Sequence, residues 1–207
     1  MKMEFYSIEQ HREELEECSY SKNVLFALRC CERLYPNFVF FSSKFRTGDP
    51  VPLRQSLDFS WLSLLDDERK IDVSEYLFSS IESQMPDTEC FDTIYVSSAL
   101  DACAACLLLL EFLRHRRLNR ILEIATLARD TVDMFVQELE NLPPNDPDIE
   151  KKIQAHELMQ NEIKVQKSTM MLLKSINTIT PDIVVKLKEE WSNLSKGSIN
   201  IDVSSIS

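Results

Sequence analysis

The chain has 207 residues and a formal net charge of −11, and it contains only two glycines, Gly48 and Gly197. This length suits one domain with a sizeable core, and the scarcity of glycine disfavours sandwiches and barrels, whose turns need many. The negative charge disfavours nucleic acid as a partner, because a polyanion would be repelled, and favours a basic protein.

The N-terminal part of the chain predicts three helices. Residues 4–17 are strongly acidic with few apolar positions, which indicates an exposed or edge-lying helix. In the helix that follows, apolar side chains recur at three- and four-residue steps, as on a helix packed against a core: Val24, Leu25, Leu28, Cys31 and Leu34. Because proline cannot continue a helix but suits a first turn, we predict that this helix ends near Tyr35 and a short one starts at Pro36.

The next stretch predicts a loop and two further helices. Residues 47–52 have the composition of a loop. Residues 53–65 place Leu53, Leu57 and Trp61 on one side of a helix, and Arg54 and Asp58 are spaced as a four-residue ion pair on another. Residues 73–85 predict a helix that Pro86 stops, and residues 86–93 form a loop.

Residues 96–117 combine a Cys-x-x-Cys with a leucine-rich run. Such a pair can be a redox couple or half of a zinc site. No strand precedes Cys103 and Cys106, and the other cysteines form no second pair that would complete a zinc site. We therefore interpret both thiols as small core side chains. The longest apolar run, residues 102–110, is far shorter than the roughly 20 residues of a membrane span, so no span is predicted.

Three arginines end this stretch: Arg114, Arg116 and Arg117. Cations are favourable at the C-terminus of a helix, where carbonyl oxygens carry partial negative charge. Capping and ion pairing are therefore the preferred interpretation. Contact with phosphate or nucleic acid is the alternative, but interleaved aromatic residues and a wider basic field are missing.

The C-terminal part predicts three helices and a tail. Residues 119–139 form an apolar stripe that starts at Asn119 as N-cap, and residues 149–176 form the longest helix, with Gln166 on its apolar line. A final helix runs from Pro181, after the cap Thr180, to near Trp191. Residues 192–207 read as a polar, mobile tail. We predict an all-α fold in which residues 1–191 form a single-domain bundle of about seven or eight helices.

The sequence offers no constellation for catalysis. His11, His115 and His156 belong to no Glu-x-x-His or His-Glu-x-x-His motif, and no phosphate-binding glycine loop or nucleophile elbow is present. We therefore predict no catalytic residue, no metal, no cofactor and no enzyme activity.

Asp101 stands out because it lies in the most apolar helix. An unpaired buried carboxylate is costly, so a hydrogen-bonded structural role, with Arg29, Arg54 or backbone amides as partners, is preferred over catalysis. The predicted structural polar residues are Asp101, Arg54, Asp58 and Trp61.

Acidic residues gather in several segments. The candidate partner-binding set is Glu9, Glu13, Glu14, Glu16, Glu17, Asp66, Asp67 and Glu68, and a further group is Asp146, Asp148 and Glu150. Such charge can serve solubility alone, or it can accelerate encounter with a basic protein. The first residues show no secretory signal, which predicts a cytosolic protein with reduced cysteines.

Several segments together resemble the bacterial YjaG-like family, domain of unknown function 416. They are "FALRCCERLYPNFVFF", "LRQSLDFSWLSLL", "YVSSALDACAACLLL", "ATLARDTVDMFV" and "HELMQNEIKVQKSTMMLLK". The positions that match the family pattern are Arg33, Pro36, Arg54, Asp58, Trp61, Asp101, Ala102 and Cys103. The resemblance implies a helical bundle from a bacterial cytosol and no established activity. The glutamate-rich beginning and Cys106 depart from the pattern.

Two functional hypotheses follow. The first is a non-enzymatic acidic protein that binds a basic protein partner, most concretely an immunity-type inhibitor that neutralises a bacterial toxin domain. The alternative is an uncharacterised housekeeping protein of the YjaG-like type, a possible homodimer with an unknown small ligand.

Overall fold

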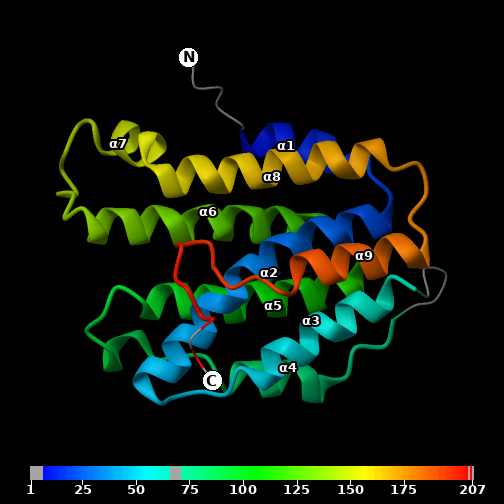
Figure 1. Cartoon of the computed structure of the whole chain (residues 1–207), viewed down its shortest axis with the longest axis horizontal. Coiled ribbons are helices and arrows are strands. Elements are labelled where there is room, and N and C mark those ends of the chain that lie inside the picture. The colour runs from blue at the N-terminus through cyan, green and yellow to red at the C-terminus, as the bar shows by residue number, and fades with distance from the viewer. Residues whose placement is uncertain (1–6, 66–70, 205, 207) are drawn as a thin grey trace.

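The structure is a computed structural model that describes residues 7–65, 71–204 and 206. These residues form a single all-α domain without β-strands, which confirms the predicted fold class (Figure 1). The helices are α1 (Ile8–Glu16), α2 (Tyr20–Phe45), α3 (Val51–Ser63), α4 (Glu75–Glu82), α5 (Val96–His115), α6 (Asn119–Leu139), α7 (Ile149–Ala155), α8 (Glu157–Ser175) and α9 (Pro181–Trp191), with a 3-10 turn η1 (Thr88–Cys90).

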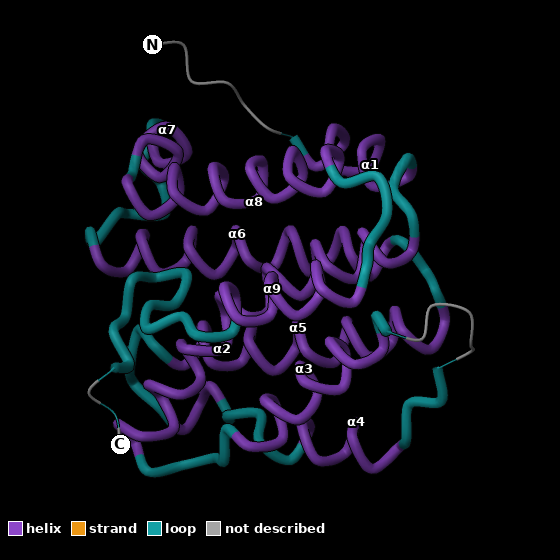
Figure 2. Tube along the Cα trace, turned by 45° about the vertical axis from the view of Figure 1, so that its right-hand side comes forward, coloured by secondary structure: helices purple, strands orange, loops and turns teal. Residues whose placement is uncertain are grey.

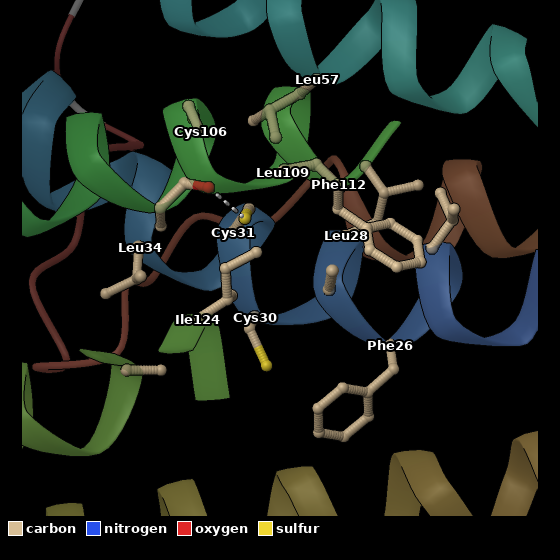
Figure 3. Packing of buried hydrophobic residues seen from close by; sticks show 14 of the residues in the cluster. Phe26, Leu28, Cys30, Cys31, Leu34, Leu57, Cys106, Leu109, Phe112 and Ile124 are labelled. Carbon is tan, nitrogen blue, oxygen red and sulfur yellow. Dashed lines mark hydrogen bonds between the residues drawn. The ribbon is translucent and has the colours of Figure 1, made fainter. Parts of the chain in front are cut away.

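The core lies where α2, α5 and α6 pack against one another. Helices α3 and α4 cover α5 on one side, and α8 runs along α6 on the other, with α1 and α7 beside it (Figures 1 and 2). Leu28 of α2 lies beside Leu109 and Phe112 of α5 in this interior, whereas Phe26 points to the opposite side of α2, where its ring lies 5.3 Å from that of His11 (Figure 3). Helix α2 is buried on most of its surface, which explains its dense run of apolar residues.

Helix α2 is continuous through Pro36, so the predicted break near Tyr35 is wrong. It ends only at Arg46, which adopts the left-handed conformation and donates its amide to the carbonyl of Ser42. A proline inside a helix costs about 3 kcal/mol, and buried neighbours on both sides, Leu34 and Phe38, supply packing that offsets this cost.

The predicted helix over residues 149–176 is two helices, α7 and α8. The chain is extended at His156, where φ is −66° and ψ is 140°. The His156 Nδ1 atom accepts the amide hydrogen of Leu158 at 3.2 Å and so caps α8. The longest helix is α2, with 26 residues. Asn119 is the first residue of α6 rather than its cap.

Helix α9 begins and ends as predicted, with the Thr180 hydroxyl accepting the amide of Ile183. The segment after it differs from the expected mobile tail, because it folds back over α2 (Figure 1). The Ser198 amide donates to the carbonyl of Arg33 at 2.8 Å, and Asn37 Nδ2 donates to Ser198 Oγ at 2.9 Å. Ile199 is buried in a small apolar cluster with α6 and α8. One isolated bridge joins Lys196 and Asp202.

Helix α5 is the central helix of the bundle. Cys103 and Cys106 are buried in the core as predicted, and the Cys31 thiol on α2 donates to the Ala105 carbonyl at 3.6 Å (Figure 3). Among the described helices, α5 alone is long and apolar enough to cross a membrane by length and composition. It is mostly buried, and it packs against α2, α3, α4 and α6, which is the setting of a core helix in a bundle.

The arginines at the end of α5 have the capping and pairing roles that the sequence indicated. Arg114 Nη1 lies 2.7 Å from Glu75 Oε1, and its guanidinium lies over the ring of Phe78. Arg116 is the left-handed C-cap residue and donates its amide to the carbonyl of Phe112.

Candidate functional site

A buried charge pair joins α2 and α8. The Glu162 side chain is fully buried, and the Arg33 side chain is only 8% exposed. Arg33 Nε donates to Glu162 Oε2 at 3.0 Å, and Gln166 Nε2 donates to Glu162 Oε1 at 2.9 Å. Both carboxylate oxygens therefore have a donor, as a buried carboxylate requires.

Gln166 connects this pair to α1 and α6. Its Nε2 atom also donates to the Ala125 carbonyl at 3.1 Å, and its Oε1 atom accepts from Arg129 Nε at 2.9 Å. His11 Nε2 lies 3.0 Å from Gln166 Oε1 and 2.8 Å from Arg129 Nη2, so it is a donor to the first or an acceptor from the second, according to tautomer. Burial, and then the nearby Arg129, lower the pKa of His11 to about 4, so this imidazole is neutral at pH 7.

A second buried cluster surrounds Glu32 on α2. Its carboxylate accepts a bidentate pair of hydrogen bonds from Arg54 at 2.8 and 2.7 Å, and a third bond from Trp61 Nε1 at 2.7 Å. Arg54 Nε lies 3.3 Å from Asp58 Oδ2, the predicted four-residue pair. Three of the four predicted structural polar residues, Arg54, Asp58 and Trp61, therefore meet around a glutamate that the sequence analysis did not single out.

Asp101 is not part of that cluster, so the expected arginine or amide partner is wrong. Thr131 Oγ1 on α6 lies 2.7 Å from Asp101 Oδ2 and 2.8 Å from the Leu127 carbonyl oxygen. One hydroxyl hydrogen cannot serve both acceptors, so both contacts are hydrogen bonds only when Asp101 is protonated and donates to Thr131. Burial raises the pKa of Asp101 to about 6, against the lowering effect of the Thr131 hydrogen bond, so the protonated arrangement belongs to pH values below about 6.

The candidate acidic residues do not form one uniform surface. Glu9, Glu13 and Glu16 on α1 are exposed. Glu14 and Glu17 face Lys174 of α8, whose Nζ lies 3.0 and 3.9 Å from their carboxylates. Asp66, Asp67 and Glu68 lie outside the described residues.

An open groove of about 1060 Å³ lies between α6, α8 and residues 196–201 of the C-terminal segment, and we call it the α6–α8 groove. Its apolar lining is mainly aliphatic and consists of Leu139, Leu158, Ile163, Ile199 and Ile201, with Tyr95 and Phe135 beside them. Its cationic lining consists of Arg33, Lys164, Lys167 and Lys196, against the single carboxylate of Glu157. The groove is therefore locally basic in an acidic chain.

The groove contains none of the predicted site residues. The sequence gives little indication of this groove, because the residues that line it come from five separate segments. Two lysines at a three-residue step, Lys164 and Lys167, share a face of α8, and Gln166 on the apolar line of the same helix marks the buried network beneath. Among the described residues no group of three His, Cys, Asp or Glu is placed to hold a metal ion.

Comparison with known proteins assigns the chain to a family. The family model described as "Protein of unknown function (DUF416)" matches residues 10–204. The chain belongs to the DUF416 family. It is 25% identical to the uncharacterized protein YjaG of Salmonella typhimurium, over 91% of this chain and 94% of that protein. It is 27% identical to an uncharacterized protein of Haemophilus influenzae, with the same two coverages.

A solved DUF416 structure shares the fold. The crystal structure of a DUF416 family protein from Shewanella baltica is 26% identical and has a TM-score of 0.84, covering 92% of this chain and 97% of that one. The YjaG-like resemblance is thus confirmed, and the DUF416 match includes the segment after α9 that folds back over α2.

Proposed function

We propose that this DUF416 protein is a non-enzymatic binding protein that holds a small ligand in the α6–α8 groove. The observation that carries the proposal is the groove itself, which combines an aliphatic floor with a few charged side chains in a volume of about 1060 Å³. Ligand sites in proteins are typically concave, mainly apolar and about 300–1,000 Å³ in volume. The homodimer in the alternative hypothesis is not needed for this site, because one chain lines it.

The chemistry of the lining supports binding rather than catalysis. The groove residues are mainly lysines, amides and apolar side chains, together with Glu157, with Arg33, which is paired with the buried Glu162, and with His156, whose Nδ1 atom is engaged in capping α8. Burial raises the pKa of Asp101 to about 6 and also raises the pKa of Asp130, and it lowers the pKa of His11 to about 4; none of these three residues lines the groove.

A role as an immunity-type inhibitor stays a prediction, and its support is the negative net charge of the chain. A basic protein partner would be attracted by the exposed glutamates of α1, but two of the five candidates there face Lys174. The cytosolic location likewise stays a prediction.

The proposal is tested by titrating ¹⁵N-labelled protein with the neutral apolar probe N-phenyl-1-naphthylamine. We expect saturable fluorescence enhancement, with amide shift changes concentrated at Leu139, Ile163 and Ile199. The matched variants are Leu139→Trp, which fills the groove, and Leu62→Trp, which changes an exposed leucine of α3 outside it. Binding that maps elsewhere, or that survives Leu139→Trp unchanged, would contradict the proposal.

A further inference from the structure

We infer that the ligand of the α6–α8 groove is a single-chain aliphatic anion, a free fatty carboxylate being the simplest example, with its chain on the aliphatic floor and its head group among the lysines. This inference rests on the proposed function and names the ligand class of the same site.

The floor of the groove favours an aliphatic chain over a flat aromatic group. Five of its seven apolar side chains are leucine or isoleucine. The two aromatic rings have other neighbours: Tyr95 and Phe135 lie 6.0 Å apart, and Lys44 Nζ lies 4.5 Å above the Tyr95 ring. Each methylene group buried on such a floor adds favourable apolar burial, which gives a chain an advantage over a small ion.

The rim of the groove favours a negative head group. Most lysines elsewhere with a described partner bind a carboxylate, as Lys152 binds Asp146 and Lys188 binds Asp58. Lys164 makes no such salt bridge among the residues that the structure describes. Lys196 pairs with Asp202 in an isolated bridge and, after the hydrogen bonds from Ser204, helps to lower the pKa of that carboxyl. Lys164 and Lys167 lie one turn apart on the same face of α8, where an anionic head group would meet both.

The positive rim is held in place by the buried network. Arg33 enters the groove from α2 while its guanidinium is paired with the buried Glu162. The Arg33 carbonyl accepts the amide of Ser198, and this bond positions the segment that carries Lys196 and Ile199. The Arg33 side chain and the backbone that carries Lys196 and Ile199 are therefore held in place, so less ordering of the chain is needed when a ligand binds.

The expected ligand is a single dissolved molecule rather than the surface of a membrane. The groove encloses a volume suited to one small molecule, and its apolar lining lies between helices and a folded segment. A lipid surface would instead need an extended apolar face that could enter the bilayer boundary.

The test compares three probes of equal chain length and different charge: decanoate, decanol and decyltrimethylammonium, all below their micelle concentrations. Each displaces N-phenyl-1-naphthylamine in the titration described above. We expect decanoate to bind about tenfold or more tightly than the other two, because two or more lysines attract its carboxylate and not the neutral or cationic head group. Acetate, which has the head group alone, should not compete.

Matched charge reversals locate the head group. Lys164→Glu and Lys186→Glu change the net charge equally at exposed positions, but Lys186 lies on α9 and does not line the groove. We expect Lys164→Glu to weaken decanoate binding severalfold, Lys186→Glu to leave it nearly unchanged, and decanol to respond to neither. Thermal unfolding of both variants checks that the fold is retained.

The outcomes separate the two levels of the proposal. If the neutral probe binds in the groove but the three ten-carbon probes compete equally, the ligand does not need a negative head group, and the proposed binding function stands. If a mononucleotide outcompetes decanoate, the ligand class is wrong. If the protein binds lipid vesicles but not monomeric decanoate, the groove does not take its ligand as a dissolved monomer. If no probe binds in the groove, both proposals fail.

Discussion

Among the described residues, the most deeply buried salt bridge is that of Arg33 and Glu162, which joins α2 to α8. Removing one partner of such a pair leaves an uncompensated charge in the interior, which costs far more than the pair itself contributes. We expect Glu162→Gln to lower the free energy of unfolding by about 3–5 kcal/mol in urea denaturation.

The double variant Arg33→Met, Glu162→Met is the control for that prediction. It removes both charges and replaces them with apolar side chains, so its loss should be much smaller than the sum of the single losses. Additive losses would mean that the pair is not coupled and that the contact between α2 and α8 depends on other residues.

The pKa shifts of His11 and Asp101 predict opposite changes of folding stability with pH. The folded-state pKa of His11, about 4, lies below its ordinary value of 6.5, so burial of the neutral ring contributes stability above pH 6.5 that is lost as the pH falls toward 4. The folded-state pKa of Asp101, about 6, lies above its ordinary value of 3.8, so its contribution is present below pH 3.8 and is lost as the pH rises through 6. The two slopes oppose each other between pH 4 and 6.

Single variants should expose each slope. In Asp101→Asn only the His11 slope remains of the two, so the free energy of unfolding should rise between pH 4 and 6.5 more steeply than in the wild type. The contribution of His11 to that rise is on the order of 3 kcal/mol in total. In His11→Gln the slope should turn negative, because Asp101 acts alone. Urea unfolding at half-unit pH steps measures both slopes, and parallel profiles for all three proteins would refute the assignment.

The sequence could predict polar contacts that are local and not those that are distant. Arg54 and Asp58 are four residues apart on one helix, so helical geometry alone brings them together. Glu32 and Trp61 meet only through the packing of α2 on α3, and Arg33 meets Glu162 across 129 positions. Asp101 was recognised as a buried carboxylate, but nothing in the spacing indicates that Thr131 lies opposite it.

At the scale of elements, the apolar period predicted where helices lie but not always where they break. The bounds of α6 follow from its apolar stripe, and those of α9 from its stripe and its Thr180 cap. The prediction failed at Pro36, because tertiary packing outweighs the local cost of a proline. It also failed at His156, where no glycine or proline marks the break and the His156 side chain itself caps the next helix.

The C-terminal segment provides an element-scale prediction. A methyl group at Gly197 would lie 2.1 Å from Asn37 Oδ1, and Asn37 is fully buried and cannot retreat into solvent. We expect Gly197→Ala to detach residues 196–203 from α2 at a cost of about 1–3 kcal/mol, seen as faster amide exchange in that segment. The bundle itself should keep its slow exchange.

Asn37→Ala supplies the control for this displacement. It removes the side chain that the new methyl group would strike, so adding Gly197→Ala to the Asn37→Ala background should cost less than adding it to the wild type. Equal costs in both backgrounds would show that the close approach to Asn37 does not limit the residue at 197.

At the scale of the whole molecule, net charge is an average that conceals local arrangement. The value of −11 predicted a basic partner, yet the groove carries lysines from α8 and from the C-terminal segment. Composition cannot show this, because the lysines are separated along the chain and meet only after folding. The fold class could be read from the sequence, whereas the groove required the assembled structure.

The reactivity of the cysteine thiols can show whether the domain unfolds as one unit. Cys30 and Cys31 on α2, and Cys103 and Cys106 on α5, are buried, and burial raises the pKa of each thiol. Because the thiolate is the reactive form, these four should react with a thiol reagent only when the bundle unfolds. Cys90 is exposed and should react first.

Labelling followed by mass spectrometry of peptides can separate these classes. We expect immediate modification at Cys90, slower modification at the half-buried Cys18, and one common rate for the four core thiols that rises with urea as global unfolding does. Cys90→Ser should remove only the fast phase. A Cys-x-x-Cys that acted as a redox pair would need an accessible thiolate, so modification of Cys103 or Cys106 ahead of Cys30 and Cys31 would show that α5 opens separately and that its thiols are more than core side chains.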